Sequence, residues 1–230
     1  MKCYYDLHIH SALSPCGDDE MTPNNIVNMA IIKGLDAIAV TDHNSCGNVR
    51  AVMEAAGDRL LVVPGMEVET AEEVHVVCYF PTIGAAEQMQ EIVRAHLPPV
   101  QNQKDIFGNQ LYMNAADEVT GEEGLLLVRA TTLPIEAVFR SAAACGGIAV
   151  PAHIDRSSYS VLSNLGFIPP ELPVRTVEIT PKNRARMEKE FETYHILSNS
   201  DAHYLEDIAE PVYFLDISSK NVEQILCKIE

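Results

Sequence analysis

The order of apolar segments along the chain is the feature that most limits what it can fold into. Short apolar runs of residues that favour strands, the first at residues 4–10, alternate with helical patterns. Thr22-Pro23 predicts the start of the first helix, as its cap and first helical residue, and Gly34 predicts its end. Strand–helix–strand order is typical of a parallel sheet or barrel with its helices outside, so we expect an α/β fold.

The remaining elements follow the same alternation. Further strands are predicted at residues 37–41, 60–63, 74–80, 148–151, 175–180, 196–200 and 213–217. Helices are predicted at residues 49–56, at 134–145 with Thr132 as the cap, at 182–191, and from about 221 onward. The chain of 230 residues is long enough for one compact barrel, so we expect a single domain over residues 1–230.

The stretch between the strands that carry His75 and His153 is longer than one strand–helix unit needs. We interpret residues 82–131 as an insert that folds as a helix followed by a small hairpin, because Gly108 and Gly121 lie in turn-like sequences. Its role is either that of a lid or specificity element, or that of a packed structural excursion.

Two histidines on the first predicted strand point to a metal site. His8 and His10 lie two residues apart, and side chains with this spacing on a strand face the same way. Two imidazoles directed to one point suit a transition metal. Taken alone, the pair is better explained as solvated or hydrogen-bonded histidines, so the rest of the chain has to decide.

Residues of metal-binding type recur where other predicted strands end, which is where the active site of an α/β barrel lies. Besides His8 and His10, the residues found there or on the adjoining strand are His43, Glu67, His75, His153, Asp201 and His203. This mixture of imidazole and carboxylate suits Zn, Mn or Fe better than Ca or Mg. The ligands are too many for one tetrahedral site, and Glu67 is the kind of carboxylate that bridges two cations.

Five short motifs, in order along the chain, resemble those of a known family. They are His8-Ile9-His10-Ser11, Thr41-Asp42-His43-Asn44, Gly65-Met66-Glu67, Pro151-Ala152-His153 and Ser200-Asp201-Ala202-His203. Together they are similar to the motifs of the PHP (polymerase and histidinol phosphatase) superfamily, and they lie within residues 4–203. The resemblance implies a distorted (β/α)7 barrel, a cluster of two or three divalent transition metals, and the activity of a stand-alone metal-dependent phosphoesterase.

The resemblance also distributes the ligands over the metals. It places His8, His10, Glu67 and Asp201 around one metal, Glu67, His75 and His153 around a second, and His43 and His203 around a third.

One position departs from the family pattern. The family has an Asp or His a few residues after the second histidine of the opening motif, where this chain has Pro15-Cys16-Gly17-Asp18-Asp19. Either Cys16 or Asp18 fills this place in the third metal site. We favour Asp18, because an oxygen donor suits a hydrolytic site whereas a thiolate suits a structural one.

Other polar residues near the motifs are given supporting roles. Asp42 points away from the adjacent histidine on a strand, and we expect it to support the site rather than bind metal. Asp6 is predicted to be a buried, hydrogen-bonded acid, and Glu69 is predicted to lie on the rim. His96 and His195 match no motif and are interpreted as ordinary histidines.

Charge and cysteine content narrow the functional classes. The net charge of −17 argues against broad binding to long nucleic acids, which depends on Lys and Arg. The six cysteines show no Cys-x-x-Cys pair and no compact disulfide spacing, and the chain has neither a signal peptide nor a long apolar run. We therefore expect a reduced, cytoplasmic protein without a membrane partner.

The predicted activity is hydrolysis of a small phosphomonoester or a nucleotide, by in-line attack of a metal-bridging hydroxide. Arg156 is predicted to hold the phosphate, the alternative being a surface salt bridge to Asp155 or a neighbour. His203 is a candidate for protonating the leaving group. A second hypothesis is an exonuclease or phosphodiesterase acting on short oligonucleotides, and a third is a non-catalytic, metal-binding regulatory module.

Overall fold

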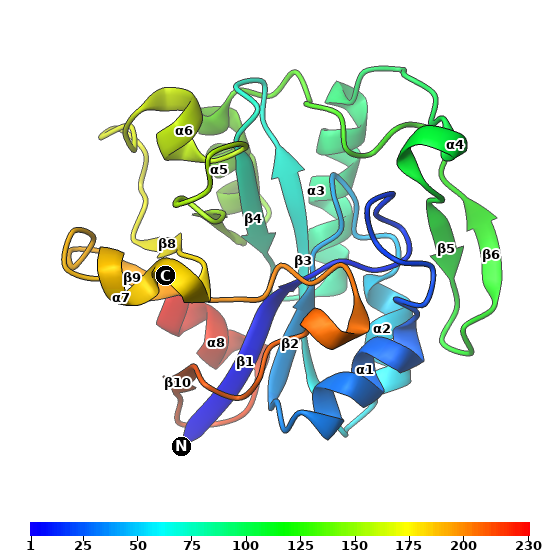
Figure 1. Ribbon diagram of the computed structural model, residues 1–230, viewed down its shortest axis with the longest axis horizontal. Helices are drawn as coiled ribbons and strands as arrows, with labels where there is room; N and C mark the ends of the chain where they lie inside the picture. Colours follow the sequence, from blue (N-terminus) through cyan, green and yellow to red (C-terminus); the bar gives the residue numbers. More distant parts are fainter.

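The computed structural model describes residues 1–230. Its centre is a six-stranded sheet in the order β10-β1-β2-β3-β4-β7 (Figure 1). The strands are β1 (Lys2–Ile9), β2 (Ala37–Val40), β3 (Leu61–Glu69), β4 (His75–Tyr79), β7 (Ile148–Pro151) and β10 (Phe214–Asp216). A separate parallel pair, β8 (Thr176–Glu178) and β9 (His195–Leu197), follows β7 along the chain.

The sheet is parallel in its centre and antiparallel at both edges, since β10 also pairs antiparallel with β1. Strands β1, β2 and β3 run parallel, and every residue of β2 is buried, as expected for a strand covered on both faces. Strand β4 is antiparallel to β3, because residues 70–74 between them are too few for the helical crossover that a parallel pair needs. Strand β7 is antiparallel to β4 and therefore points the same way as β3. The wholly parallel sheet suggested by the alternation is thus corrected to a mixed one.

Two contacts show that the sheet curls toward a barrel. Tyr79 on β4 donates a hydrogen bond from its hydroxyl to the carbonyl oxygen of Leu7 on β1 at 2.9 Å, although β2 and β3 separate these strands in the sheet. Ile9 and Ala202 form a parallel bridge that joins the segment after β9 to the end of β1. The α/β class is confirmed, but the count of seven βα units is not, because β3 and β4 form a hairpin.

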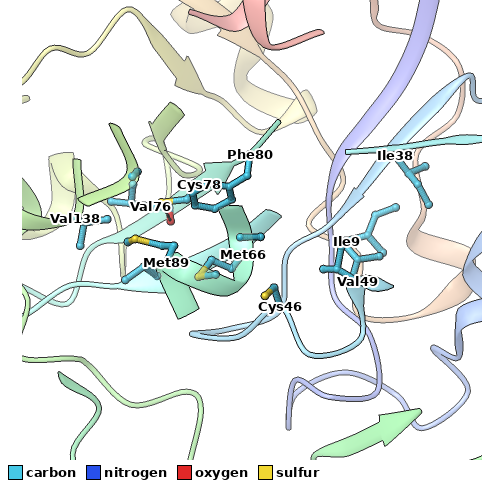
Figure 2. Close-up of a cluster of buried hydrophobic side chains, with 14 of the residues drawn as sticks. Ile9, Ile38, Cys46, Val49, Met66, Val76, Cys78, Phe80, Met89 and Val138 are labelled. Carbon is cyan, nitrogen blue, oxygen red and sulfur yellow. Dashed lines mark hydrogen bonds between the residues drawn. The ribbon is translucent and has the colours of Figure 1, made fainter. Parts of the chain in front are cut away.

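Side chains alternate between two cores on opposite faces of the sheet. On β4, Val76 and Cys78 pack into the larger core, part of which is drawn in Figure 2, whereas Val77 and Tyr79 pack into the smaller one. Helices that contribute to the larger core are α1 (Pro23–Ile32), α2 (Val49–Ala56), α3 (Ile83–His96) and α5 (Ile135–Ala144). Helix α8 (Val222–Ile229) contributes Ile225 to the smaller core. Each fully buried aliphatic side chain stabilises the fold by about 1.5–3 kcal/mol.

Of the two helix caps predicted from the sequence, the structure confirms one and corrects the other. Helix α1 begins after Thr22, whose hydroxyl accepts a hydrogen bond from the backbone of Asn25 at 3.4 Å. The prediction that Thr132 caps α5 is wrong. Helix α5 begins after Pro134, and the Thr132 hydroxyl donates to the carbonyl oxygen of His96 instead.

Residues 82–131 fold as a helix followed by a hairpin, as predicted. After α3 come α4 (Lys104–Phe107), β5 (Leu111–Met113) and β6 (Val119–Glu122), and this hairpin lies at the edge of the molecule (Figure 1). Asn48 ties it to the barrel by donating to the carbonyl oxygen of Leu111 and accepting from the backbone of Met113, both at 2.9 Å. At Gly108 an added Cβ would lie 2.3 Å from the carbonyl oxygen of Pro15, so the insert also packs tightly on the loop after β1.

The remaining helices are short and lie on connections. They are α6 (Val161–Leu165), α7 (Pro181–Met187) and the single turn η1 (Leu205–Asp207). Among the helices of this chain, none combines the length and the apolar character that crossing a membrane requires.

Candidate metal centre

Eight of the nine predicted ligands meet at one end of the sheet. They are His8 and His10 at the end of β1, His43 after β2, Glu67 within β3, His75 at the start of β4, His153 after β7, and Asp201 and His203 after β9. His75 reaches this end because β4 runs opposite to β3, which pairs it with Glu69. The bridge between Ile9 and Ala202 brings the last two ligands beside β1.

The carboxylate of Glu67 lies at the centre of this group and is only 1% exposed. Its Oε1 lies 3.0 Å from Nδ1 of His75 and 3.3 Å from Nε2 of both His8 and His153. Its Oε2 lies 3.0 Å from Nδ1 of His43. Each oxygen therefore faces its own imidazoles, which suits a carboxylate that bridges two cations.

The hydrogen bonds of His10 leave its unprotonated Nε2 facing the carboxylate of Asp201. The Ser14 hydroxyl donates to Asp42 at 2.7 Å, so its oxygen accepts from Nδ1–H of His10 at 3.0 Å. Burial lowers the pKa of His10 well below its ordinary value, which keeps the ring neutral. Its Nε2 then directs a lone pair at Oδ1 of Asp201, 3.0 Å away. Two acceptors at this distance fit a cation that both ligate.

The environment of His8 leads to the same conclusion. Both oxygens of Glu178 lie 3.1 Å from its Nδ1, which leaves Nε2 directed at Glu67 and Asp201, each at 3.3 Å. Nε2 of His8, Nδ1 of His43 and both oxygens of Glu67 are buried and lack a hydrogen-bond partner. Buried polar atoms without partners are rare and costly, so this arrangement fits metal ligation.

The charges of the group hold its carboxylates ionised. Burial opposes ionisation of Glu67, yet His75, His8 and His43 hold the pKa of this carboxyl well below its usual range. Burial likewise opposes ionisation of Asp201, and His8 is the main group that lowers the pKa of Asp201. Ionised carboxylates are the form that binds metal, so both side chains are ready to act as ligands.

The ligand atoms form three overlapping groups, within each of which they lie less than 4.8 Å apart. The groups are His8, His10 and Asp201; His43, Glu67 and His75; and His10, His43 and His203. The Cys16 thiol belongs to none of the three groups, but His43 and His203 of the third group influence its ionisation. Although burial opposes ionisation, these two histidines lower the pKa of Cys16 to about 6.

Asp18, which the sequence favoured for the third metal site, lies outside the three groups. Its carboxylate accepts a hydrogen bond from the backbone of Glu20 at 2.9 Å and belongs to none of the three groups. Its backbone N–H donates to the carbonyl oxygen of His203 at 2.9 Å, which ties the loop after β1 to the segment that carries Asp201 and His203. The choice between Asp18 and Cys16 for the third metal site therefore stays a prediction, and the lowered pKa of the Cys16 thiol is the observation that favours Cys16.

Arg156 lies at the edge of the group of candidate ligands. Its Nη1 is 2.6 Å from Oδ2 of Asp201, and its side chain is 44% exposed. Asp155, an alternative partner, accepts hydrogen bonds from Thr180 and Asn183 instead. Arg156 and Asp201 also line a cavity of about 490 Å³. The guanidinium thus has one anchored edge, and its remaining N–H groups are available to a phosphate.

The sequence interpretation missed Glu178 and misplaced Glu69. Glu178 is a buried acid in the apolar strand β8, and this pattern alone signals a specific partner. Glu69 was predicted to lie on the rim but is only 4% exposed, because β3 continues to this residue. Its Oε2 lies 3.8 Å from Nε2 of His75.

The residues given supporting roles lie as predicted. Asp6 is buried and accepts hydrogen bonds from the hydroxyl and backbone of Ser200, at 2.6 and 3.0 Å. Asp42 accepts from Ser11 in the same way, at 2.6 and 2.7 Å. His96 and His195 belong to none of the three ligand groups.

Comparison with known proteins agrees with this geometry. The model of the PHP domain family matches residues 6–157, more than half of the chain. This chain belongs to the PHP domain family. The matched part of the PHP domain includes every candidate ligand from His8 to His153, whereas Asp201 and His203 follow it. The family resemblance seen in the five sequence motifs is therefore confirmed.

Curated relatives of this PHP domain match over a limited stretch. The 5′-3′ exoribonuclease Rnm of Salmonella typhimurium is 33% identical over 79 residues, which is 32% of this chain and 26% of that protein. Rnm of Escherichia coli is 32% identical over 79 residues. The match thus spans about a quarter of the length of these relatives.

Solved structures share the fold over the whole chain. The lesion-specific endonuclease PfuEndoQ of Pyrococcus furiosus superposes with a TM-score of 0.74 at 21% identity, over 100% of this chain and 56% of that protein. A putative metal-dependent phosphoesterase of Bifidobacterium adolescentis gives a TM-score of 0.64 at 18% identity, over 97% and 96% of the two chains. At such identities the likeness shows the fold alone.

Proposed function

We propose that this PHP domain protein is a metal-dependent phosphoesterase that hydrolyses the phosphate ester of a nucleotide or of another small phosphomonoester. The observation that carries the proposal is the buried Glu67 carboxylate, surrounded by histidines, with the exposed guanidinium of Arg156 at the edge of the group. Divalent transition metals bound there would supply Lewis acidity toward the phosphate and would activate water at neutral pH.

Three sets of residues would hold these metals. We assign the first set to His8, His10, Glu67 and Asp201, the second to Glu67, His75 and His153, and the third to His43, His203 and Cys16. The hydrogen bonds that Glu178 and Ser14 accept from His8 and His10 support the first set, because they direct both Nε2 atoms into the group. The lowered pKa of the Cys16 thiol, caused by His43 and His203, supports the third set.

Arg156 would bind the phosphate of the substrate. Its ion pair with Asp201 restrains the guanidinium, so little side-chain entropy is lost when a phosphate binds to its free N–H groups. His203 is a candidate for two roles, metal ligand and proton donor to the leaving group. Its Nδ1 lies 2.8 Å from the carbonyl oxygen of Asp201 and donates to it. Only Nε2 is then free, so it can either bind metal or donate a proton, but not both at once. The place of His203 in the third group favours the ligand role.

The test is phosphate release from an aryl phosphate and from a panel of nucleoside monophosphates, with Mn or Zn supplied. The variant with both His8→Ala and Asp201→Ala is expected to lose at least about 100-fold in rate, because it loses ligands of the first metal. His96→Ala is the matched control, since this exposed histidine lies outside the group. Equal rates in the double variant and the wild type would refute the proposal. A wild type that binds metal without hydrolysing any substrate would favour the regulatory module.

A second candidate is an exonuclease that acts on short oligonucleotides. It is supported by the partial match to the exoribonuclease Rnm and by the fold shared with endonuclease Q, which has been solved with a 27-mer duplex at its active site. The net charge of −17 favours short over long polymers. Progressive shortening of a labelled oligomer would support this candidate, whereas an intact oligomer beside cleaved mononucleotide would exclude it.

A further inference from the structure

Tyr159 is an aromatic residue beside the candidate metal ligands, and the proposed chemistry gives it no role. Its ring stacks on the imidazole of His75, with ring centroids 4.9 Å apart and an angle of 22° between the planes. The residue is nevertheless 47% exposed. One face of the ring therefore covers a candidate metal ligand, and much of the remaining surface is open to solvent.

The backbone holds Tyr159 in a conformation that side chains rarely adopt. Its φ is +54°, in the left-handed region that disfavours residues with a Cβ. Two contacts fix it there: its carbonyl oxygen accepts from the backbone of His75 at 2.9 Å, and the next residue, Ser160, caps α6. Such strain persists only where the surrounding structure imposes it.

The residues other than glycine that share this left-handed conformation lie either in hairpin turns or at the candidate metal site. Six residues other than glycine have a positive φ: Asn44, Glu73, Asp117, His153, Tyr159 and Asp201. Glu73 and Asp117 lie in the hairpin turns between β3 and β4 and between β5 and β6. His153 and Asp201 are candidate ligands, and Asn44 follows a third, His43. Tyr159 lies in no hairpin turn, so it belongs with the strained residues of the site.

A purely supporting role for the ring is a weak explanation. His75 is already oriented by Glu67, whose Oε1 lies 3.0 Å from its Nδ1. An aliphatic side chain would shield the imidazole equally well. The exposed aromatic ring instead has the form of a stacking platform. Any of the nucleobases can stack on an aromatic side chain, because each has a flat π face.

The same loop carries the cation that would bind phosphate. Arg156 precedes Tyr159 by three residues and pairs with Asp201, and the Ser160 hydroxyl donates to the carbonyl oxygen of Arg156 at 2.8 Å. The loop thus presents a ligand at His153, a guanidinium at Arg156 and an exposed aromatic ring at Tyr159. A phosphate joined to a planar base matches the last two groups.

We propose that Tyr159 stacks on the nucleobase of a nucleotide, or of the terminal residue of a short oligonucleotide, whose phosphate is bound by Arg156. This inference rests on the proposed phosphoesterase function and narrows its substrate class from phosphomonoesters in general to those that carry a base. Tyr159 is then a specificity residue, and its contribution appears only with substrates that have a planar ring.

The experiment compares adenosine monophosphate with ribose 5-phosphate, which lacks the base, on the metal-loaded protein. For Tyr159→Leu the KM and the Kd for adenosine monophosphate are expected to rise about tenfold or more. The kcat and both constants for ribose 5-phosphate are expected to stay within about twofold, and Tyr159→Phe is expected to behave as the wild type because it retains the stacking ring. Phe167→Leu is the control, since Phe167 is 58% exposed and lies after α6.

Two outcomes would overturn the inference. An equal loss with both substrates, together with a lower metal content per chain, would show that Tyr159 only supports His75. Unchanged constants for both substrates would show that the ring has no role in binding. The Kd is measured by calorimetry, so a protein without turnover would refute the proposed function while the dependence of nucleotide affinity on Tyr159 still decides this inference.

Discussion

Glu178 and His8 are joined through both carboxylate oxygens, each of which lies 3.1 Å from Nδ1 of the imidazole. Glu178 also accepts hydrogen bonds from the backbone of His153 at 3.2 Å and from the side chain of Asn199 at 2.7 Å. The carboxylate therefore connects β8 to two candidate ligands on other strands. It fixes the tautomer of His8, so that Nε2 is the nitrogen that faces the metal group.

Replacing Glu178 should weaken metal binding without removing a ligand. Glu178→Gln lacks the negative charge that strengthens the hydrogen bond from Nδ1–H of His8. We therefore expect metal affinity to fall by about 10- to 100-fold. Competition with a chelating dye measures this affinity. Glu171→Gln, which changes an exposed acid on the connection before β8, should leave the affinity unchanged. An unaltered affinity in Glu178→Gln would show that His8 needs no such support.

Metal binding should stabilise the fold, and Glu67 should be required for the effect. A metal at 100 times its dissociation constant adds about 2.7 kcal/mol to the free energy of unfolding, which raises Tm by several degrees. We expect Zn or Mn to raise the Tm of the wild type and a chelator to reverse the shift. Glu67→Gln should lose most of the shift, and His96→Gln should retain it. An equal shift in both variants would place the stabilising metal elsewhere.

Most of the fold, and the grouping of most candidate ligands, could be predicted from the sequence, because both depend on local patterns. The i, i+2 spacing of His8 and His10 on β1 correctly predicts that their rings lie together, with centroids 5.2 Å apart. The positions of His43 and His153 directly after predicted strands correctly predict that both imidazoles lie beside the carboxylate of Glu67.

The features that the sequence did not reveal depend on contacts between distant segments. The antiparallel β3–β4 hairpin extends β3 to Glu69 and buries that residue, which no local pattern indicates. The choice between Cys16 and Asp18 depends on a hydrogen bond from the loop after β1 to the carbonyl oxygen of His203. Such a pairing is set by tertiary structure, so residue chemistry alone does not decide between the two residues.

The insert should contribute a pH-dependent part of the stability through Glu123. Burial opposes ionisation of this carboxyl, but Arg94, the backbone of Leu125 and the Tyr112 hydroxyl hold the pKa of Glu123 below its usual range. A lowered folded-state pKa adds stability above the unfolded value of about 4.3, and this stability is lost as pH falls through the folded value.

Glu123→Gln is therefore expected to be less stable than the wild type by about 1–2 kcal/mol at pH 7, and the difference should shrink below about pH 4. Urea unfolding of both proteins across this range measures the difference, in which contributions common to both cancel. Glu122→Gln is the matched control, since its pair with Lys104 is exposed and should contribute less than about 1 kcal/mol. A difference that is independent of pH would mean that the charge of Glu123 is not what stabilises the insert.

Cobalt substitution should decide which residue completes the third group of ligands. A thiolate bound to Co²⁺ gives an intense charge-transfer band in the near ultraviolet, whereas a carboxylate does not. We expect this band in the wild type and in Asp18→Asn, because the Asp18 carboxylate bonds to the backbone of Glu20 instead. Cys16→Ser should lose the band and bind one equivalent of metal more weakly, while Cys227→Ser, at an exposed cysteine on α8, should keep both. A band that survives Cys16→Ser, or that never forms, would restore Asp18 as the candidate ligand.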